Sequence, residues 1–417
     1  MIRNRWFILL LAVLLALPAV SFGEAAPTVA SEKGMLVSTE EELQPEAERL
    51  SFYVRFEVTG HSEIPEKLLL DSVQRSEAFF PYEQFSIYWN EEVAGHWLCV
   101  QWNVIPYDVT LIEFDIHGQQ LRKTSVPEQY DYVLELAADT KRVTFAADRQ
   151  GMEVARISLY SEGALPEPFV PWQPTQGHLD YLIISTHPDD DVLFMGGVAP
   201  IYGMERGYTG TVAYVTSPGR VRIDEAMRGA WTMGVRLWPV FLGFRDISDI
   251  HQNQYRNQFL PEAVTLAIVR LLREQRPLVV FAQDVNGEYG HWQHIVVSAA
   301  VLEACKLALD ETYDPASAEK FGVWEVKKCY LHLYPENPLI LDVETPLASM
   351  GGKTAIQVAQ EAYTKHLSQQ AGRHKVQTNK DSHPLSKFGM AYGTVEAGED
   401  AFDNIDPQLL VSALSNN

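Results

Sequence analysis

The sequence predicts an α/β fold with a doubly wound, mostly parallel sheet, preceded by a small all-β sandwich. From residue 180 onward, short apolar runs alternate with segments of helical periodicity. This alternation is typical of a parallel sheet with helices on both faces. Between residues 50 and 161, short alternating runs are separated by turn residues, which is the pattern of an antiparallel sandwich.

Prolines mark the boundary between the two patterns. Four of them fall within nine residues, at Pro166, Pro168, Pro171 and Pro174. Proline at this density extends and stiffens a chain. We therefore predict a sandwich domain over 49–163, a linker over 164–179 and an α/β domain over 180–417.

The N-terminus has the layout of a secretory signal peptide. Two arginines precede an uncharged, mostly apolar run over 6–20, and Ser21-Phe22-Gly23 offers a small-x-small cleavage site. The run is shorter than the ~20 residues that a spanning helix needs. We expect cleavage after residue 23, ahead of an uncleaved anchor, then a flexible lead-in over 24–48. The expected location is secreted or extracytoplasmic, without stable membrane insertion after cleavage.

Charge and cysteine content narrow the class of partner. The chain has 33 Lys and Arg against 55 Asp and Glu, a formal net charge of −22. Such an acidic chain is a poor match for nucleic acid or an anionic membrane surface. Cys99, Cys305 and Cys329 are too few for a disulfide framework in an exported chain. We expect them to be small buried apolar residues.

The first domain is predicted from five alternating runs, at 51–56, 97–102, 109–114, 132–136 and 154–159. By this pattern the region resembles a discoidin-like or galactose-binding-like β-sandwich. Trp89 and Trp102 would bind carbohydrate if they were exposed, whereas core packing is the commoner role for such residues.

The α/β domain is predicted from strands over 180–186, 211–216, 239–244, 278–282 and 329–333. Helices are expected over 192–202, 223–233 and 261–274, with a fourth beginning near His291. A C-terminal helix over 354–370 is expected to cover the sheet, with Lys365 or His366 lining the site. The first strand is not followed by G-x-G-x-x-G, so dinucleotide binding is not indicated.

Two polar motifs follow the first and fourth strands of this domain. The first motif is residues 187–191 (His-Pro-Asp-Asp-Asp), in which Pro188 suits the first position of a helix. The second motif is residues 287–294 (Gly-Glu-Tyr-Gly-His-Trp-Gln-His). In the common strand order 3-2-1-4-5, strands 1 and 4 are neighbours, and ligands bind outside their carboxyl ends. We therefore expect the two motifs to meet there.

The residues that would meet suit metal-assisted hydrolysis of an amide. His187, Asp190 and His294 form an open set of three ligands. Zn²⁺ is the first choice, and Fe²⁺ or another divalent ion also fits. Such an ion lowers the pKa of a coordinated water to ~7 and polarises a carbonyl. Asp189 is the candidate general base. His291, as an imidazolium, would stabilise the oxyanion or protonate the departing nitrogen.

Each motif alone also has an ordinary explanation. Carboxylates at a helix start interact favourably with the helix dipole, and His-x-x-His on a helix occurs by chance. The two together, each after its own strand, are a stronger signal. The remaining histidines without such company are expected to be ordinary surface or partly buried residues; they are His61, His96, His117, His251 and His374.

Both motifs and the strand–helix order between them resemble the PIG-L/LmbE-like de-N-acetylase family over residues 180–400. The resemblance implies a Rossmann-like sheet and a metal-dependent, usually zinc, enzyme that removes acetyl groups from N-acetylglucosaminyl conjugates. It assigns His187, Asp190 and His294 to the metal. Asp189 corresponds to the general base, and His291 corresponds to the residue that assists the intermediate.

Further positions match the family, and two depart from it. Arg222 belongs to an Arg-x-x-Glu helix and is a candidate substrate contact, with an ion pair to Glu225 or Asp224 as the alternative. Asp246 matches another position near the site, with a turn residue as the alternative. Asp191 stands where the family usually has Glu, and Gln293 replaces a frequent Asp.

The sequence thus predicts an exported zinc-dependent N-deacetylase. Its expected substrate is an N-acetylated amino sugar or conjugate, including a cell-wall polymer or extracellular glycan. Two alternatives stay open. One is a non-catalytic extracellular glycan-binding protein that retains the α/β scaffold, and the other is an amidase on another N-acyl substrate.

Overall fold

The computed structural model describes residues 45–58, 78–80, 84–147, 152–166, 169–175, 177–247, 259–372 and 374–411. They belong to one compact unit, Gln44–Asn417. The expected signal peptide, nearly all of the lead-in, His61 and His251 lie outside the described residues.

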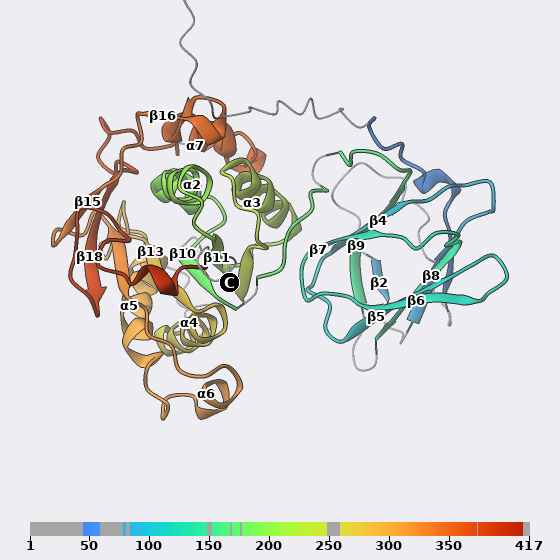
Figure 1. Cartoon of the computed structure of the whole chain (residues 1–417), viewed down its shortest axis with the longest axis horizontal. Helices are drawn as coiled ribbons and strands as arrows, with labels where there is room; N and C mark the ends of the chain where they lie inside the picture. The colour runs from blue at the N-terminus through green and yellow to red at the C-terminus, as the bar shows by residue number, and fades with distance from the viewer. Residues whose placement is uncertain are drawn as a thin grey trace, which may run out of the picture. The chain divides into compact units, whose positions relative to one another are not determined.

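Two antiparallel sheets form the first region, as the alternating runs predict. One sheet has the order β1 (Arg55–Val58), β3 (Gln84–Tyr88), β8 (Arg142–Ala147), β5 (Val109–Phe114), β6 (Gln120–Ser125). The other has the order β2 (Ala78–Phe80), β9 (Met152–Tyr160), β4 (Trp97–Trp102), β7 (Asp131–Glu135). Figure 1 shows these strands mainly in blue and cyan, with β9 in green.

Aromatic side chains fill the space between these sheets. Phe85 of β3 stacks on Phe145 of β8 with ring centroids 4.8 Å apart. Trp89 and Trp102 are 2% and 0% exposed, so they belong to the core and are not carbohydrate platforms. Residues 51–53 form a 3₁₀ turn instead of the expected strand start, because the N–H of Tyr53 bonds back to a carbonyl three residues earlier.

The second region has a seven-stranded sheet with the order β12-β11-β10-β13-β14-β18-β15. Its parallel part is β12 (Val240–Phe244), β11 (Gly210–Thr216), β10 (Leu179–Ser185), β13 (Pro277–Ala282) and β14 (Lys328–His332). This is the predicted order 3-2-1-4-5. Two antiparallel strands extend the edge beside β14, namely β18 (Lys387–Gly393) and β15 (Pro338–Ile340). The edge extension was not predicted.

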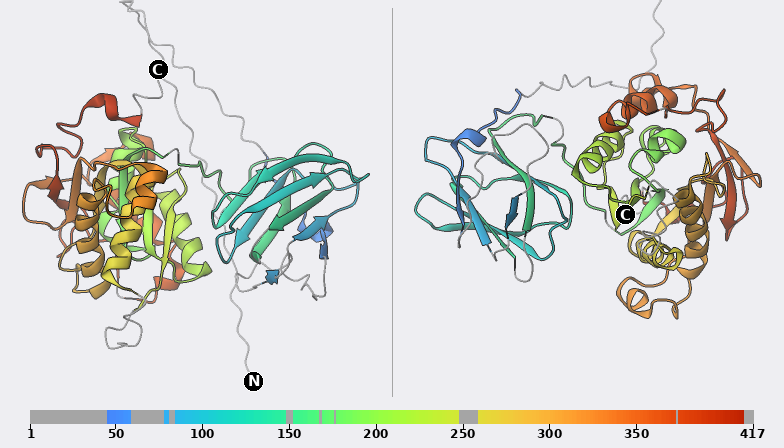
Figure 2. Two further views of the ribbon diagram at one scale, coloured as in Figure 1. Left: turned by 90° about the horizontal axis from the view of Figure 1, so that it is seen from below. Right: turned by 180° about the vertical axis from the view of Figure 1, so that it is seen from behind.

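Helices cover both faces of this sheet (Figure 2). One face packs on α2 (Asp190–Met195), the π-helical η2 (Ala199–Glu205), α3 (Arg220–Thr232) and α7 (Ala355–Tyr363). The other face packs on α4 (Pro261–Gln275) and α5 (Trp292–Leu307). A short helix, α6 (Pro315–Phe321), packs on α4. Side chains of β10 alternate between the hydrophobic cores on the two faces of the sheet. Tyr181 and Ile183 pack on the α2–α3–α7 face, and Leu182 and Ile184 pack on the α4–α5 face.

The helix after β10 differs from the prediction at its start and in its middle. Pro188 is not the first helical residue, because the N–H groups of Asp189 and Asp190 both bond to the carbonyl of His187 and form a turn first. The expected helix over 192–202 is divided at Gly196 and Gly197. A Cβ on Gly196 would lie 2.7 Å from the Cβ of Ala359, so α7 packs closely at this break.

Arg220, at the start of α3, connects the two regions. Its guanidinium donates to the carbonyls of Trp102 and Tyr130, each at 3.0 Å. It also pairs with the carboxylates of Asp131 and Asp224. Both acidic side chains are buried. This ion cluster therefore holds strands β4 and β7 against α3, the helix that also carries Arg222.

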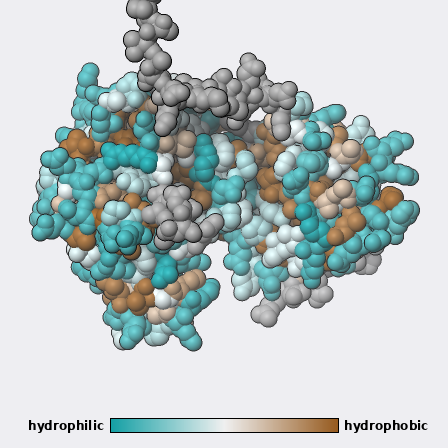
Figure 3. Space-filling view, in the orientation of Figure 1, coloured by the Kyte–Doolittle hydropathy of each residue, from teal (hydrophilic) through white to brown (hydrophobic). Residues whose placement is uncertain are grey.

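The surface and the cysteines agree with an ordinary globular fold. On the face in Figure 3, hydrophobic residues form separate patches among hydrophilic ones. Cys99, Cys305 and Cys329 are free and buried, as expected. Among the described residues, every helix is too short or too polar to cross a bilayer.

Candidate active site

The two motifs meet at the carboxyl edge of the parallel sheet, as the strand order predicts. Strands β10 and β13 are parallel neighbours, and the first motif follows β10 while the second follows β13 and opens α5. The N–H of Thr186 donates to Oε1 of Gln283 at 2.8 Å and holds the two loop starts together. The polar groups of both motifs are therefore placed by two central, paired strands of the sheet.

Three atoms that could bind a metal ion form a small triangle of donor atoms at this edge. Nδ1 of His187 lies 2.9 Å from Oδ2 of Asp190 and 3.0 Å from Nε2 of His294. The third side, from Oδ2 of Asp190 to Nε2 of His294, is 3.1 Å. Ligand atoms at ~2.0–2.1 Å from a tetrahedral zinc ion lie roughly 3.3 Å apart. The triangle therefore fits one divalent ion with little movement.

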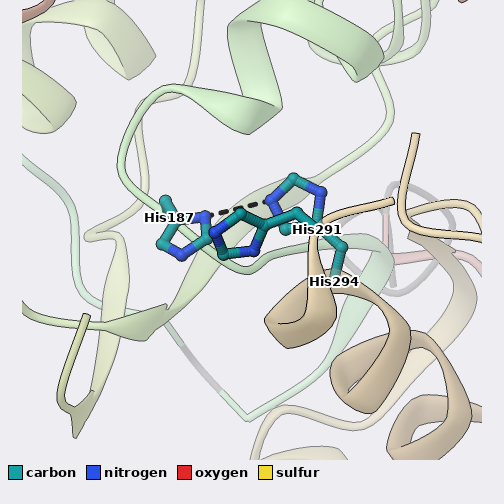
Figure 4. Close-up of side chains that lie close together, drawn as sticks. All are labelled: His187, His291 and His294. Carbon is teal, nitrogen blue, oxygen red and sulfur yellow. Dashed lines mark hydrogen bonds between the residues drawn. The ribbon is translucent and has the colours of Figure 1, made fainter. Parts of the chain in front are cut away.

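His291 offers a second arrangement of donors. Nitrogen atoms of His187, His291 and His294 all lie within 4.8 Å of one another. Figure 4 shows the three imidazoles gathered, with a dashed line between His187 and His294. The set with Asp190 is tighter and supplies a negative charge that offsets a cation. The ligand roles of His187, Asp190 and His294 stay predictions.

Charges in the triangle depend on one another. Burial acts against the charged forms, but His294 and His187 hold the pKa of Asp190 well below its usual range. In return, and again against burial, Asp190 and Glu288 raise the pKa of His294 to about 10. Without a metal, the proton that His294 keeps at neutral pH supplies positive charge beside Asp190.

Asp189 lies beside the triangle and pairs with Arg222. Burial and the charge of Asp190 raise the pKa of Asp189 to about 7, while Arg222 lowers it. Nη2 of Arg222 lies 2.9 Å from Oδ1 of Asp189 and 2.8 Å from the carbonyl of Pro188. The alternative pairing of Arg222 with Glu225 is not observed, because the Glu225 carboxylate accepts from the N–H and hydroxyl of Ser368.

His291 is neutral near pH 7 in the metal-free protein. Burial, followed by the charges of His187 and His294, lowers its pKa to about 3. The imidazolium expected from the sequence is therefore disfavoured. Nδ1 of His291 has no hydrogen-bond partner among the described residues, and the ring faces the cavity.

A cavity of about 320 Å³ opens over these groups. Ten residues line it: His187, Asp189, Asp190, Leu193, Arg222, Asp246, Tyr289, His291, Gln369 and His374. Asp246 lies at the cavity as expected, with Oδ1 3.7 Å from Nε2 of His187. The alternative partner for Arg222, Asp224, is instead paired with Arg220.

The segment after α7 contributes to the cavity in a way the sequence did not indicate. His374 was expected to be an ordinary histidine, yet it lines the cavity with its ring 5.4 Å from that of Tyr289. His366, expected to line the site, lies beside Pro188 and Arg222 but is fully buried against α3, and Gln369 reaches the cavity instead. Gln369 ends a short 3₁₀ turn, η5 (Leu367–Gln369), and His374 lies in irregular chain, so no long periodic pattern marks them in the sequence.

Buried polar residues support the two histidines from behind. Gln293 Oε1 lies 3.1 Å from Nε2 of His187, and Glu288 Oε2 lies 2.7 Å from Nδ1 of His294. His332, at the end of β14, contacts the same Glu288. The sequence placed Glu288 within the second motif and His332 within a strand, but gave neither a role.

Asp191 is part of the core and not of the cavity lining. It is fully buried, and its Oδ2 accepts a hydrogen bond from the Tyr214 hydroxyl at 2.8 Å. Its other oxygen has no hydrogen-bond partner among the described residues. Burial raises the pKa of Asp191 to about 8, so the group is mainly protonated at neutral pH.

Comparison with known proteins covers the region that carries both motifs. Residues 182–305 match the family model described as PIG-L: GlcNAc-PI de-N-acetylase. The chain is 30% identical over 200 residues to the 1D-myo-inositol 2-acetamido-2-deoxy-alpha-D-glucopyranoside deacetylase of Geodermatophilus obscurus, covering 41% of this chain and 66% of that protein. The chain thus spans just under two thirds of this curated relative.

Solved structures are similar to parts of the chain. The N,N'-diacetylchitobiose deacetylase from Pyrococcus horikoshii is 20% identical with a TM-score of 0.37, over 48% of this chain and 74% of that one. The CpGH89CBM32-6 module produced by Clostridium perfringens is 14% identical with a TM-score of 0.22, over 28% of this chain and 100% of that one. Over residues 182–305, which carry both site motifs, the chain is similar to the PIG-L/LmbE-like deacetylase family.

Proposed function

We propose that this chain is a zinc-dependent hydrolase that removes the N-acetyl group from an N-acetylglucosamine-type conjugate outside the cytoplasm. The observation that carries the proposal is the triangle of donor atoms on His187, Asp190 and His294, with the Asp189 carboxylate beside it. The match to a family described as a de-N-acetylase supports the same chemistry.

The metal would be held by His187, Asp190 and His294. Two imidazole nitrogens and one carboxylate oxygen suit Zn²⁺, and Fe²⁺ binds similar sets. Such an ion, when bound, polarises a carbonyl and makes water more acidic. The side chains around the triangle then have to position the amide and move the protons.

Asp189 is the proposed general base. A pKa of about 7 leaves a substantial fraction of the carboxyl group ionised at neutral pH while keeping it basic enough to accept a proton. Arg222 holds the carboxylate at Oδ1 and the preceding carbonyl, so the base has a fixed direction. Arg222 also lines the cavity and is proposed to contact the substrate.

His291 is proposed to stabilise the negative charge that develops on the carbonyl oxygen. Its neutral ring has one N–H, and the cavity is lined by this ring. A positioned N–H donor stabilises an oxyanion without itself carrying charge. Asp189, once it has taken a proton from water, can pass that proton to the departing nitrogen, so the neutral His291 ring keeps its own N–H.

The cavity suits a single sugar unit. Its volume of about 320 Å³ lies at the lower end of the ~300–1,000 Å³ typical of small-molecule sites. Tyr289 offers an aromatic ring that is half exposed, and Asp246 and Gln369 offer polar groups for hydroxyls. The relative from Geodermatophilus obscurus is named for a 2-acetamido-2-deoxy-glucopyranoside substrate, which supports the same sugar class here.

The location outside the cytoplasm is proposed from the predicted signal peptide alone. Sequencing the N-terminus of the protein recovered from the medium or periplasm of an export-competent bacterial host tests it. We expect a mature chain that begins just after residue 23. Full-length protein confined to the cytoplasm would contradict the proposed location without bearing on the chemistry.

Acetate release tests the proposed reaction. Zinc-loaded protein should release acetate from N-acetylglucosaminyl compounds, lose this activity in a chelator, and regain it with added Zn²⁺. A panel of N-acylated amino acids and simple amides serves as the comparison. Activity confined to that panel would make the protein an amidase of another class, and no release from any N-acetyl sugar would overturn the proposal.

A further inference from the structure

A fully buried carboxylate stands directly behind one of the proposed metal ligands. Oε2 of Glu288 lies 2.7 Å from Nδ1 of His294, and Oε1 lies 3.3 Å from Nδ1 of His332. Oε1 also accepts the N–H of Asp284 at 2.8 Å. The side chains of Glu288, His294 and His332 are 0% exposed. Both oxygens therefore work as acceptors in a place that water does not reach.

We propose that Glu288 is a positioning residue that fixes the tautomer and direction of His294 for metal binding. An ionised carboxylate only accepts hydrogen bonds, so the bond at Nδ1 keeps the proton on that nitrogen. The lone pair of Nε2 is then directed toward Asp190 and His187, where the donor triangle lies. This inference rests on the proposed metal centre and adds the residue that orients it.

The backbone around Glu288 is built for this task. Glu288 has φ 51°, in the left-handed region that disfavours residues with a side chain. Gly287 directly before it has φ 74°, and Gly290 two residues after it has φ 83°. A Cβ on Gly287 would lie 2.5 Å from the carbonyl of His291, so that position admits only glycine. His383 holds the carbonyl of Glu288 from the other side. Such strain persists only where surrounding contacts determine the conformation.

Replacing the carboxylate by an amide separates this role from simple space filling. In Glu288→Gln the side chain keeps its shape but has one acceptor oxygen and one NH₂ group. If the NH₂ faces His294, it favours the tautomer with the proton on Nε2. That nitrogen then has no lone pair available for the metal. If it faces Asp284, two N–H groups oppose each other. Either orientation weakens the metal site.

The test is the zinc affinity of the full chain, measured by competition with a chromophoric chelator. We expect Glu288→Gln to bind Zn²⁺ 10- to 100-fold more weakly, the loss typical when such an outer partner of a ligand is removed. Glu303→Gln is the matched control, because it makes the same change at an exposed position of α5. Equal affinity of wild type and Glu288→Gln would overturn the inference.

A measurement on the wild type covers the case in which the variant does not fold. Long-range ¹H–¹⁵N correlation spectra of the zinc-loaded protein should show His294 protonated at Nδ1 and bound through Nε2. Binding through Nδ1 would overturn the inference. Zinc binding without acetate release would refute the proposed function and leave this inference standing, whereas no zinc binding at all would refute both.

Discussion

Three consecutive aspartates have different charge states because their neighbours differ. Two imidazoles surround Asp190 and hold its pKa well below the usual range. Burial and the negative charge of Asp190 raise the pKa of Asp189 to about 7, although the guanidinium of Arg222 lowers it. The carboxyl group of Asp191 accepts a hydrogen bond from the Tyr214 hydroxyl, but burial outweighs that bond and raises its pKa to about 8. At neutral pH the three differ as an anion, a titrating base and a neutral acid.

The pH dependence of activity should follow the surroundings of Asp189. Activity requires the ionised base, so kcat/KM should rise with pH through the pKa of Asp189 and then level off. Arg222 lowers that pKa, so Arg222→Met should move the acidic limb to higher pH by about 1 unit or more. Arg270→Met, at an exposed pair on α4, is the control. If the acidic limb of the pH profile stayed at the same pH in Arg222→Met, a group other than Asp189 would set that limb.

The buried Asp191 should make stability depend on pH. Its folded pKa of about 8 lies above the unfolded value, so its contribution is present at low pH and is lost as pH rises toward 8. In Asp191→Asn this loss is absent. The free energy of unfolding of the variant minus that of the wild type should therefore increase with pH, by up to ~1.4 kcal/mol per pH unit between pH 6 and 8. Urea denaturation in a chelator measures it, and a constant difference would contradict the argument.

At the scale of elements, the site depends on which strands are neighbours. The alternating pattern predicted β10 and β13 side by side, and this brought the distant His294 to His187. The sequence did not reveal Gln369 and His374, since a short 3₁₀ turn positions Gln369 and irregular chain positions His374. Nor did it reveal the role of Glu288, because its direction depends on a left-handed turn and on a strand-end histidine far away in the chain.

The packing of α3 on the segment after α7 gives a prediction at this scale. A Cβ on Gly229 would lie 2.6 Å from Nε2 of His366, which is fully buried. Gly229→Ala should therefore lower the free energy of unfolding by about 1–2 kcal/mol, since overpacking outweighs the ~1 kcal/mol gain in helix propensity.

The double variant isolates this contact. In a His366→Ala background the clash is gone, so Gly229→Ala should become neutral or stabilising by up to ~1 kcal/mol. Chemical denaturation of the four proteins measures the coupling. The same change in both backgrounds would show that His366 is not the residue that limits this position.

At the scale of the whole molecule, the antiparallel region and the α/β region share a buried ion cluster. Arg220 faces Asp131 from one region and Asp224 from its own helix, and it donates to carbonyls of the sandwich. The helix that begins at Arg220 also carries Arg222, which holds the proposed base. The sandwich is thereby connected to the site through one turn of helix.

Removing the arginine should be costly because it takes the guanidinium charge away from two buried carboxylates, Asp131 and Asp224. Arg220→Met should lower the free energy of unfolding by about 3–5 kcal/mol. Arg270→Met, at an exposed pair with Asp314, should cost less than ~1 kcal/mol. Equal effects of the two substitutions in urea denaturation would show that the cluster contributes little to the folded state.

The central claim is that Asp190 belongs to the metal site whereas its neighbour Asp189 moves the proton. The most direct measurement is the zinc content and acetate release of Asp189→Asn, determined on the same sample. We predict that the variant keeps one zinc per chain and loses activity by 10²–10⁴-fold, the usual contribution of a general base. Normal acetate release by the zinc-loaded variant would contradict the account.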